Sequence, residues 1–141
     1  MDFEKVNLNM TLEDCISDYY INLKERNIIP NIFITDKKIE RNLNKNALYR
    51  ILGNIINNAI KYSDGDLNIS LTEEGEFIFS NSAKNLSEID LGKLFNKFYT
   101  VENGKKSTGL GLSITKYLTE KMNGRIKAKY YEGKIIIKIK F

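Results

Sequence analysis

The 141-residue sequence contains no histidine and no tryptophan, and only one cysteine and one proline. Without histidine, this chain cannot contain a catalytic triad with a histidine base, a histidine nucleophile or a histidine metal site. A single cysteine excludes an intramolecular disulfide and a cysteine-based metal cluster, which is typical of proteins in a reducing compartment. Any chemistry must therefore come from other residue types.

Long apolar runs and a strong excess of charge are also missing. No hydrophobic stretch approaches the ~20 residues of a membrane-spanning helix, and the first residues, 1–4, lack a signal-peptide pattern, so we expect a soluble piece as given. Lys and Arg outnumber Asp and Glu by 22 to 18, for a net charge of +4. This balance permits an anionic ligand without requiring nucleic acid. The length and the 42% hydrophobic content predict one domain over residues 1–141.

Apolar residues spaced three and four apart predict three helices. Asn9 or Thr11 would cap the first helix, and Cys15 would face the core as a small apolar group. The second helix has the clearest pattern, with no interruption along its apolar face. The predicted ranges are about 10–26, about 48–62, and 111–123.

Alternating apolar residues predict at least five strands, in two hairpins and one separate segment. Three helices and at least five strands favour a single α/β sandwich, with one sheet face covered by helices and the other facing solvent. The segment 81–108 is irregular, which in a domain of this size favours a functional lid. The strands are expected at 31–35, 67–71, 77–80, 126–131 and 134–141.

One edge of the second helix is polar. Asn54, Asn58 and Lys61 fall within an arc of about 60°, with Tyr62 at its border. Asn is a poor helix former, so the presence of Asn57 as well favours a binding site over a merely solvated face. An amide oxygen suits Mg²⁺ when phosphates supply the negative charge, and a lysine would offset the remaining charge.

Two further segments have the composition of ligand-binding elements. Residues 107–112 (STGLGL) lead into the third helix, where glycines allow close approach and free helix amides attract phosphate. No Gly-Lys-Ser/Thr follows, so an NTPase of the P-loop class is not expected. Residues 94–99 (LFNKFY) form an aromatic cluster inside the irregular segment, for which a loop anchor is the simpler interpretation.

In order and spacing these segments resemble the catalytic and ATP-binding domain of bacterial sensor histidine kinases, in the superfamily that also holds gyrase and MutL ATPase domains. Residues 50–63 are similar to the N box, 94–99 to the F box and 108–112 to the second glycine box. The resemblance covers essentially the whole chain. It implies the Bergerat ATP-binding fold, an α/β (α+β) two-layer sandwich with a mixed, mostly antiparallel sheet and about three helices on one face.

The resemblance also implies ATP and Mg²⁺ as ligands and assigns roles to residues. Asn58 would ligate Mg²⁺ with Asn54 beside it, Lys61 would reach phosphate oxygens, Tyr62 would stack near adenine, and residues 82–107 would form an ATP lid. The implied catalytic residues are Asn54, Lys61, Lys97 and Lys105. The implied nucleotide contacts are Asn54, Asn58, Lys61, Tyr62, Asn81, Leu86, Phe95, Thr108, Gly109, Leu110, Gly111 and Leu112.

The first glycine box departs from the family pattern. Where the family usually has Asp-x-Gly-x-Gly, this chain has residues 81–85 (NSAKN). Asn81 can still accept a hydrogen bond from the adenine amino group, whereas Ala83 and Asn85 restrict the backbone where glycine would be free. Thr100 stands where an Arg commonly follows the F box. The candidate cations for the γ-phosphate are then Lys97, Lys105 and Lys106.

The implied acceptor is a histidine, which this chain lacks, so the partners would be a dimerisation and phosphoacceptor domain outside the chain, and a response regulator. We expect a homodimeric full-length protein, a monomeric domain, and a cytoplasmic position in a membrane-anchored bacterial sensor.

An anti-sigma-type kinase or ATPase is an alternative function, but the second helix has no Glu to activate water. A weakly nucleotide-binding scaffold is another. A nucleic-acid partner is not expected, because the lysines alternate along strands instead of forming one patch.

Overall fold

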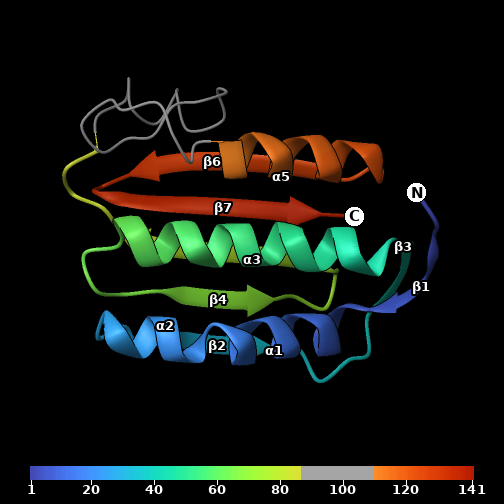
Figure 1. Ribbon diagram of the computed structural model, residues 1–141, viewed down its shortest axis with the longest axis horizontal. Helices are drawn as coiled ribbons and strands as arrows, with labels where there is room; N and C mark the ends of the chain where they lie inside the picture. The colour runs from blue at the N-terminus through green and yellow to red at the C-terminus, as the bar shows by residue number, and fades with distance from the viewer. Residues whose placement is uncertain (87–109) are drawn as a thin grey trace.

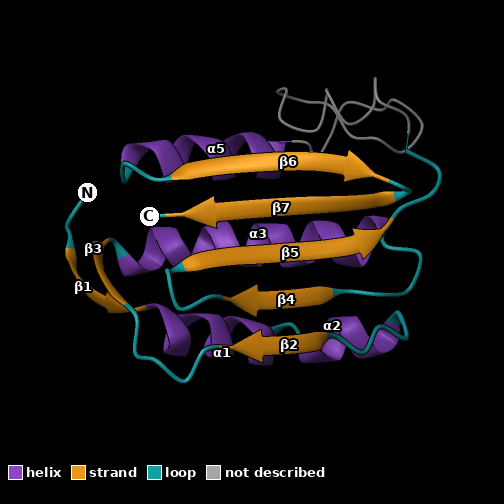
Figure 2. Cartoon of the chain, turned by 180° about the vertical axis from the view of Figure 1, so that it is seen from behind, coloured by secondary structure: helices purple, strands orange, loops and turns teal. Residues whose placement is uncertain are grey.

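The computed structural model describes residues 1–86 and 110–141, and these form a layer of helices against a sheet (Figures 1 and 2). The helices are α1 (Leu8–Asp18), α2 (Tyr20–Glu25), α3 (Lys45–Tyr62) and α5 (Leu110–Lys121). The strands are β1 (Glu4–Asn7), β2 (Asn31–Ile34), β3 (Glu40–Leu43), β4 (Asn68–Leu71), β5 (Glu76–Ser82), β6 (Arg125–Tyr131) and β7 (Lys134–Lys140).

The main sheet has the order β2-β4-β5-β7-β6. Strands β2 and β4 are parallel, and every other neighbouring pair in this sheet is antiparallel. The helices lie in front of the strands in Figure 1, and the strands lie in front when the molecule is seen from behind in Figure 2. The predicted two-layer sandwich with a mixed, mostly antiparallel sheet is thereby confirmed.

Hydrophobic periodicity explains how the layers join. The apolar face of α3 is buried along its whole length, as its spacing predicts, and α3 packs between α1 and α5. In β7 the residues Ile135, Ile137 and Ile139 are buried, while the alternating positions are half-buried or exposed. One face of the sheet therefore meets the helices and the other meets solvent.

The outer face of the sheet carries an unexpected concentration of lysine. Alternation along β6 and β7 puts every second residue on the same side, so lysines that alternate in the sequence gather into one patch. The expectation that alternation disperses them was wrong, because a strand has a period of two.

The first helix differs from its prediction. Asn7 is the N-cap, and its side chain accepts a hydrogen bond from the backbone amide of Met10 at 3.0 Å. Asn9 and Thr11 lie inside the helix, so neither is the cap. Asn9 instead forms hydrogen bonds with the segment between β2 and β3. Its Nδ2 donates to the carbonyls of Thr35 and Lys37, and its Oδ1 accepts from the amide of Ile39. The expected single helix is two, α1 and α2, which meet at Tyr19.

Strands β1 and β3 were missed. They pair antiparallel as a separate two-stranded sheet, with Glu4 opposite Leu43. Each strand buries one residue, Val6 or Leu43. A single buried side chain produces no alternating pattern, so the sequence contains no signal for this pair.

Cys15 is fully buried in α1, as expected for a core residue. Desolvation by burial, helped by the negative charge of Asp18, raises the pKa of its thiol to about 12. The thiol is therefore protonated at neutral pH and packs as an apolar group. Among the residues the structure describes, no helix is both long enough and apolar enough to cross a membrane.

Candidate functional site

A small cavity lies between α3, the sheet and α5. Its volume is about 20 Å³, enough for about one water molecule. Asn58, Tyr62 and Asn81 contribute polar groups, and the other lining residues are apolar apart from their backbone. The lining comprises Ile55, Asn58, Ala59 and Tyr62 of α3, Phe79 and Asn81 of β5, Leu112 of α5, and Ile135 and Ile137 of β7.

The asparagines of α3 differ in position. The side-chain amide of Asn58 donates to the backbone carbonyl of Asn54 at 2.8 Å, and within the described residues its Oδ1 has no hydrogen-bond donor. Asn57 is exposed and does not line the cavity. Of these two neighbours on α3, Asn58 therefore lines the cavity, and Asn57 faces solvent.

Asn54 lies one turn before Asn58 and contacts α5. Its Nδ2 is 3.4 Å from Oγ1 of Thr115 on α5, a long contact between two side chains that are buried or half-buried. Thr115 is fully buried, and its carbonyl accepts from Thr119 at 2.7 Å. Asn54 does not line the cavity itself, so its position is beside the site, between α3 and α5.

The end of α3 places two further predicted residues. Tyr62 is half-buried and lines the cavity, whereas Lys61 is exposed and does not. A guanidinium N–H of Arg26 donates to the carbonyl of Ile60 and so satisfies one of the last carbonyls of the helix. This end of α3 is thereby fixed next to the cavity.

Asn81 supplies the polar group on the sheet side. It is 6% exposed, and its Nδ2 donates to the carbonyl of Ser82 at 3.1 Å. No described residue donates to its Oδ1. Because this oxygen belongs to a residue that lines the cavity, it is an acceptor suited to an N–H donor on a bound ligand.

Asp66 is a structural residue that the sequence did not reveal. Its carboxylate accepts from the backbone amide and hydroxyl of Ser82 at 2.8 and 3.0 Å, and from the hydroxyl of Ser63 at 3.3 Å. Desolvation raises the pKa of Asp66, but these hydrogen bonds outweigh it and lower the pKa below its ordinary value. The bonds hold the loop after α3 against the end of β5, next to Asn81.

Residues 81–85, at the position of the first glycine box, have no residue with a positive φ. Neither Ala83 nor Asn85 has a positive φ, so the conformation seen here does not require glycine at either position. The backbone of Ala83 accepts from the Tyr130 hydroxyl at 2.9 Å and donates to the Gly133 carbonyl at 2.8 Å. Leu86 is buried but does not line the cavity.

Of the remaining predicted residues, those from residue 110 onward are described by the structure, at the start of α5. Leu110 and Gly111 lie in its first turn, and Leu112 is buried in the cavity lining. A third helix starting near Gly111 is therefore confirmed. Phe95, Lys97, Lys105, Lys106, Thr108, Gly109 and the lid from residue 87 to residue 107 lie outside the described residues.

Comparison with known proteins adds independent information. A family model described as histidine kinase-, DNA gyrase B-, and HSP90-like ATPase matches residues 43–140. Sensor histidine kinase YcbM of Bacillus subtilis (strain 168) is 34% identical over 139 residues, covering 91% of this chain and 45% of that protein. Sensor protein kinase WalK of Staphylococcus aureus is 28% identical over 141 residues, covering 92% of this chain and 34% of that protein.

A solved structure agrees on the fold. The nucleotide-free catalytic domain of histidine kinase ThkA superposes with a TM-score of 0.83 at 21% identity, covering 99% of this chain and 94% of that one. By contrast, this chain spans less than half the length of the curated relatives named above.

Proposed function

Since this chain belongs to the histidine kinase-, DNA gyrase B- and HSP90-like ATPases, as an ATP-binding catalytic domain of the sensor-kinase type, we propose that it transfers the γ-phosphate of Mg-ATP to a histidine outside this chain. The observation that carries the proposal is the convergence of α3, β5 and α5 on one cavity. Three segments that are distant in the sequence contribute Asn58, Asn81 and Leu112 to it.

Base recognition is assigned to Asn81. Its Oδ1 would accept a hydrogen bond from the adenine amino group, as the usual aspartate of the family would. Guanine presents a carbonyl oxygen at the equivalent position, so the same acceptor would oppose it. Phe79, Ile137 and Leu112 supply apolar contacts for the ring, and Tyr62 would pack at its edge.

Metal binding is assigned to Asn58. An amide oxygen is a hard neutral ligand, and it fits Mg²⁺ that is already bound to phosphate oxygens. Among the described residues, no group of three or more carboxylate or cysteine side chains could hold a metal ion. A bound Mg²⁺ would neutralise charge on the transferred phosphoryl group.

The other residues of the site position and neutralise the nucleotide. Lys61, exposed at the end of α3, would approach phosphate oxygens as a cation, and Asn54 would keep α3 and α5 in register through Thr115. The amides at the start of α5, where Leu110 and Gly111 lie, would contact phosphates. Contacts from Thr108 and Gly109 stay predictions. Leu86, Phe95, Lys97 and Lys105 stay predictions of lid contacts.

The acceptor and partners follow from the chemistry and from the relatives. Because the chain contains no histidine, the proposed phosphoacceptor lies outside these residues, and we assign it to a dimerisation domain. We propose a homodimeric, membrane-anchored bacterial sensor with a cytoplasmic catalytic domain, and a response regulator as the next phosphate acceptor. Hydrolysis by a helix glutamate is disfavoured, since α3 contains none.

The volume of the cavity supports a second candidate, a signalling scaffold that binds nucleotide weakly. At about 20 Å³ the cavity is smaller than an adenine ring, so a base would enter only with a rearrangement of the lining. That rearrangement would lower the apparent affinity. The scaffold and the kinase differ in the affinity for nucleotide.

Thermal unfolding with a non-hydrolysable ATP analogue and Mg²⁺ separates the two. At about 100 times Kd, the analogue should stabilise the chain by about 2.7 kcal/mol, a rise of several degrees in Tm. Labelled ATP should leave the chain itself without phosphohistidine. An unchanged Tm at millimolar analogue, in a protein that unfolds cooperatively, would refute the kinase and favour the scaffold.

A further inference from the structure

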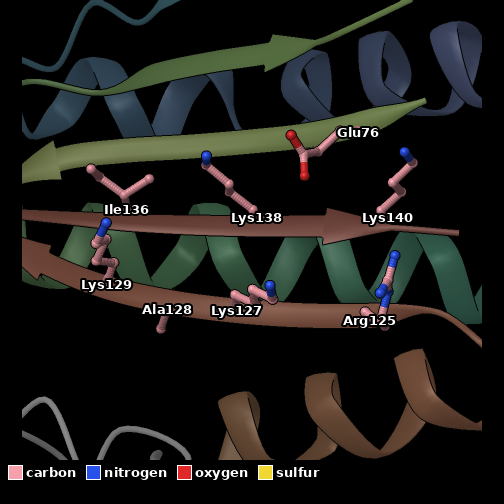
Figure 3. A pocket seen from close by; sticks show the side chains of 8 residues that line it. All are labelled: Glu76, Arg125, Lys127, Ala128, Lys129, Ile136, Lys138 and Lys140. Carbon is pink, nitrogen blue, oxygen red and sulfur yellow. The ribbon is translucent and has the colours of Figure 1, made fainter. Parts of the chain in front are cut away.

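The outer face of the sheet carries a cluster of cations, which we call the basic sheet face. Figure 3 shows their side chains projecting from β6 and β7, with β5 alongside and α3 behind the strands. The cluster borders an open pocket of about 700 Å³, in which Glu76 is the one carboxylate and Ala128 and Ile136 are the apolar members. Its cations are Arg125, Lys127, Lys129, Lys138 and Lys140.

The strand register brings like charges directly opposite one another. Arg125 pairs with Lys140 and Lys127 with Lys138 across β6 and β7, an arrangement that is destabilising by itself. On the other side of β7, Lys140 lies opposite Glu76 of β5, so one of the five cations also has an acidic neighbour. All five cations are exposed, and none forms an ion pair within residues 1–86 and 110–141, where the one pair is Lys38 with Glu40. Such a face is electrostatically complementary to an extended anionic partner.

The composition of the face distinguishes between partner classes. Lysine is depleted in protein interfaces, which favour arginine and aromatic anchors, and four of these five cations are lysines. Single-stranded nucleic acids need a series of aromatic side chains on which bases stack. No aromatic residue lines this pocket, and β6 adds a single exposed tyrosine, Tyr131, on the same side as its cations. Clusters of four to eight Lys and Arg residues beside a membrane-spanning helix or on an amphipathic helix bind anionic lipids by charge attraction, and the five cations here have that number and composition on a sheet.

We propose that the basic sheet face binds the headgroups of an anionic phospholipid bilayer. The lysine ammonium groups are mobile point charges, which suit phosphates that diffuse in a plane better than a fixed bidentate acceptor. The nucleotide cavity lies on the helix side of the same sheet, so both sites can be occupied together. The inference goes beyond the proposed kinase function and does not depend on it.

Sedimentation of the 141-residue chain with vesicles tests the proposal. Vesicles of phosphatidylcholine with about a third phosphatidylglycerol should bind the chain, whereas pure phosphatidylcholine vesicles should not. Binding should be lost when the ionic strength rises from about 0.01 M to about 1 M, because the screening length falls from about 30 Å to about 3 Å.

A matched pair of triple variants locates the binding surface. Lys127→Gln, Lys129→Gln and Lys138→Gln together should weaken binding to the anionic vesicles about a hundredfold, since each cation contributes about fivefold. The control carries Lys5→Gln, Lys24→Gln and Lys45→Gln, and so loses the same charge. These three lysines are exposed on β1, α2 and α3. The control should bind within about twofold of the parent chain and keep the parental Tm. The variant of the basic sheet face should unfold at the parental Tm or slightly above it, because it removes the like-charge pair of Lys127 with Lys138.

Three results would overturn the proposal. One is no binding to the anionic vesicles, and another is equal weakening in the two triple variants, which would indicate net charge alone. The third is preferential binding of polyglutamate or a single-stranded oligonucleotide over vesicles, which would assign the face to an acidic protein or to nucleic acid. Binding of the ATP analogue, measured in parallel, should be unchanged in all variants, and its absence would count against the kinase function only.

Discussion

Replacing Asn58 with alanine tests the metal assignment most directly, and Asn57→Ala is its matched control. The two asparagines are adjacent on α3 and undergo the same chemical change, but only Asn58 lines the cavity, and its Oδ1 has no donor among the described residues. The position on the helix is therefore the one variable between them. Neither side chain belongs to the buried apolar face of α3.

The effect of each substitution on stability is small and can be worked out from the contacts. Asn58→Ala loses a hydrogen bond to the carbonyl of Asn54, worth about 0.5 to 1.5 kcal/mol net. It regains about half a kcal/mol from the better helix propensity of alanine. Asn57→Ala makes only the second change, so both variants should unfold within about 1 kcal/mol of the parent chain.

The effect on ligand binding differs sharply between the two. Asn58→Ala removes the proposed Mg²⁺ ligand, so binding of the ATP analogue with Mg²⁺ should weaken by about 1.5 to 3 kcal/mol, or about ten- to a hundredfold. The enhancement of analogue binding by Mg²⁺ over EDTA should disappear. Asn57→Ala should retain both affinity and metal dependence.

Calorimetric titration of the ATP analogue into each variant, with Mg²⁺ and with EDTA, measures these quantities. Equal losses in the two variants would show that the helix does not present Asn58 selectively. A preserved Mg²⁺ enhancement in Asn58→Ala would refute its assignment as the metal ligand, whatever the change in affinity.

Two further predictions concern the sheet side of the site. Asn81→Leu should cost about 1 to 3 kcal/mol of ATP-analogue affinity and reduce the preference for ATP over GTP, whereas Asn81→Asp should keep both. Calorimetry measures the affinity and the selectivity of the two variants and of the parent chain. Equal values in all three proteins would refute base recognition by Asn81. The pKa of Asp66 is lower in the folded protein than in the unfolded chain. The hydrogen bonds of Asp66 with Ser82 therefore stabilise the fold at pH values above the unfolded pKa of Asp66, and this contribution is lost as the pH falls through the folded pKa. Melting curves should thus show a steeper loss of Tm below about pH 4 in the parent than in Asp66→Asn, and parallel pH profiles would contradict this role.

Local patterns in the sequence were sufficient to predict most of the helices and strands. The uninterrupted apolar spacing of α3 and the alternation in β7 each depend on a period that a single element imposes on its own residues. The hairpin of the predicted strands 67–71 and 77–80 also depends on local residues, because its turn contains Gly75, whose φ is +85°, and a tight turn restricts its own residue types. The order of the three boxes was also sufficient to predict the family.

Elements without a local pattern could not be predicted. Strands β1 and β3 bury one side chain each, and the N-cap of α1 is Asn7 because the preceding strand pairs with β3 and sets where the helix begins. Asn9 looked like a cap by residue type, yet it bonds a segment some thirty residues away. Contacts between distant segments decide these positions, and no short window of sequence contains them.

The same division applies to the sites. Helical spacing alone separated Asn58 from Asn57, since both lie on one element and the angle between them is set by its geometry. That Asn58 and Asn81 line one cavity, that Asp66 holds the adjoining loop, and that lysines on two strands form one cationic face all depend on how α3, β5, β6 and β7 pack. A sequence specifies the period within each element, whereas distances between elements exist only once the sheet register and the helix packing are formed.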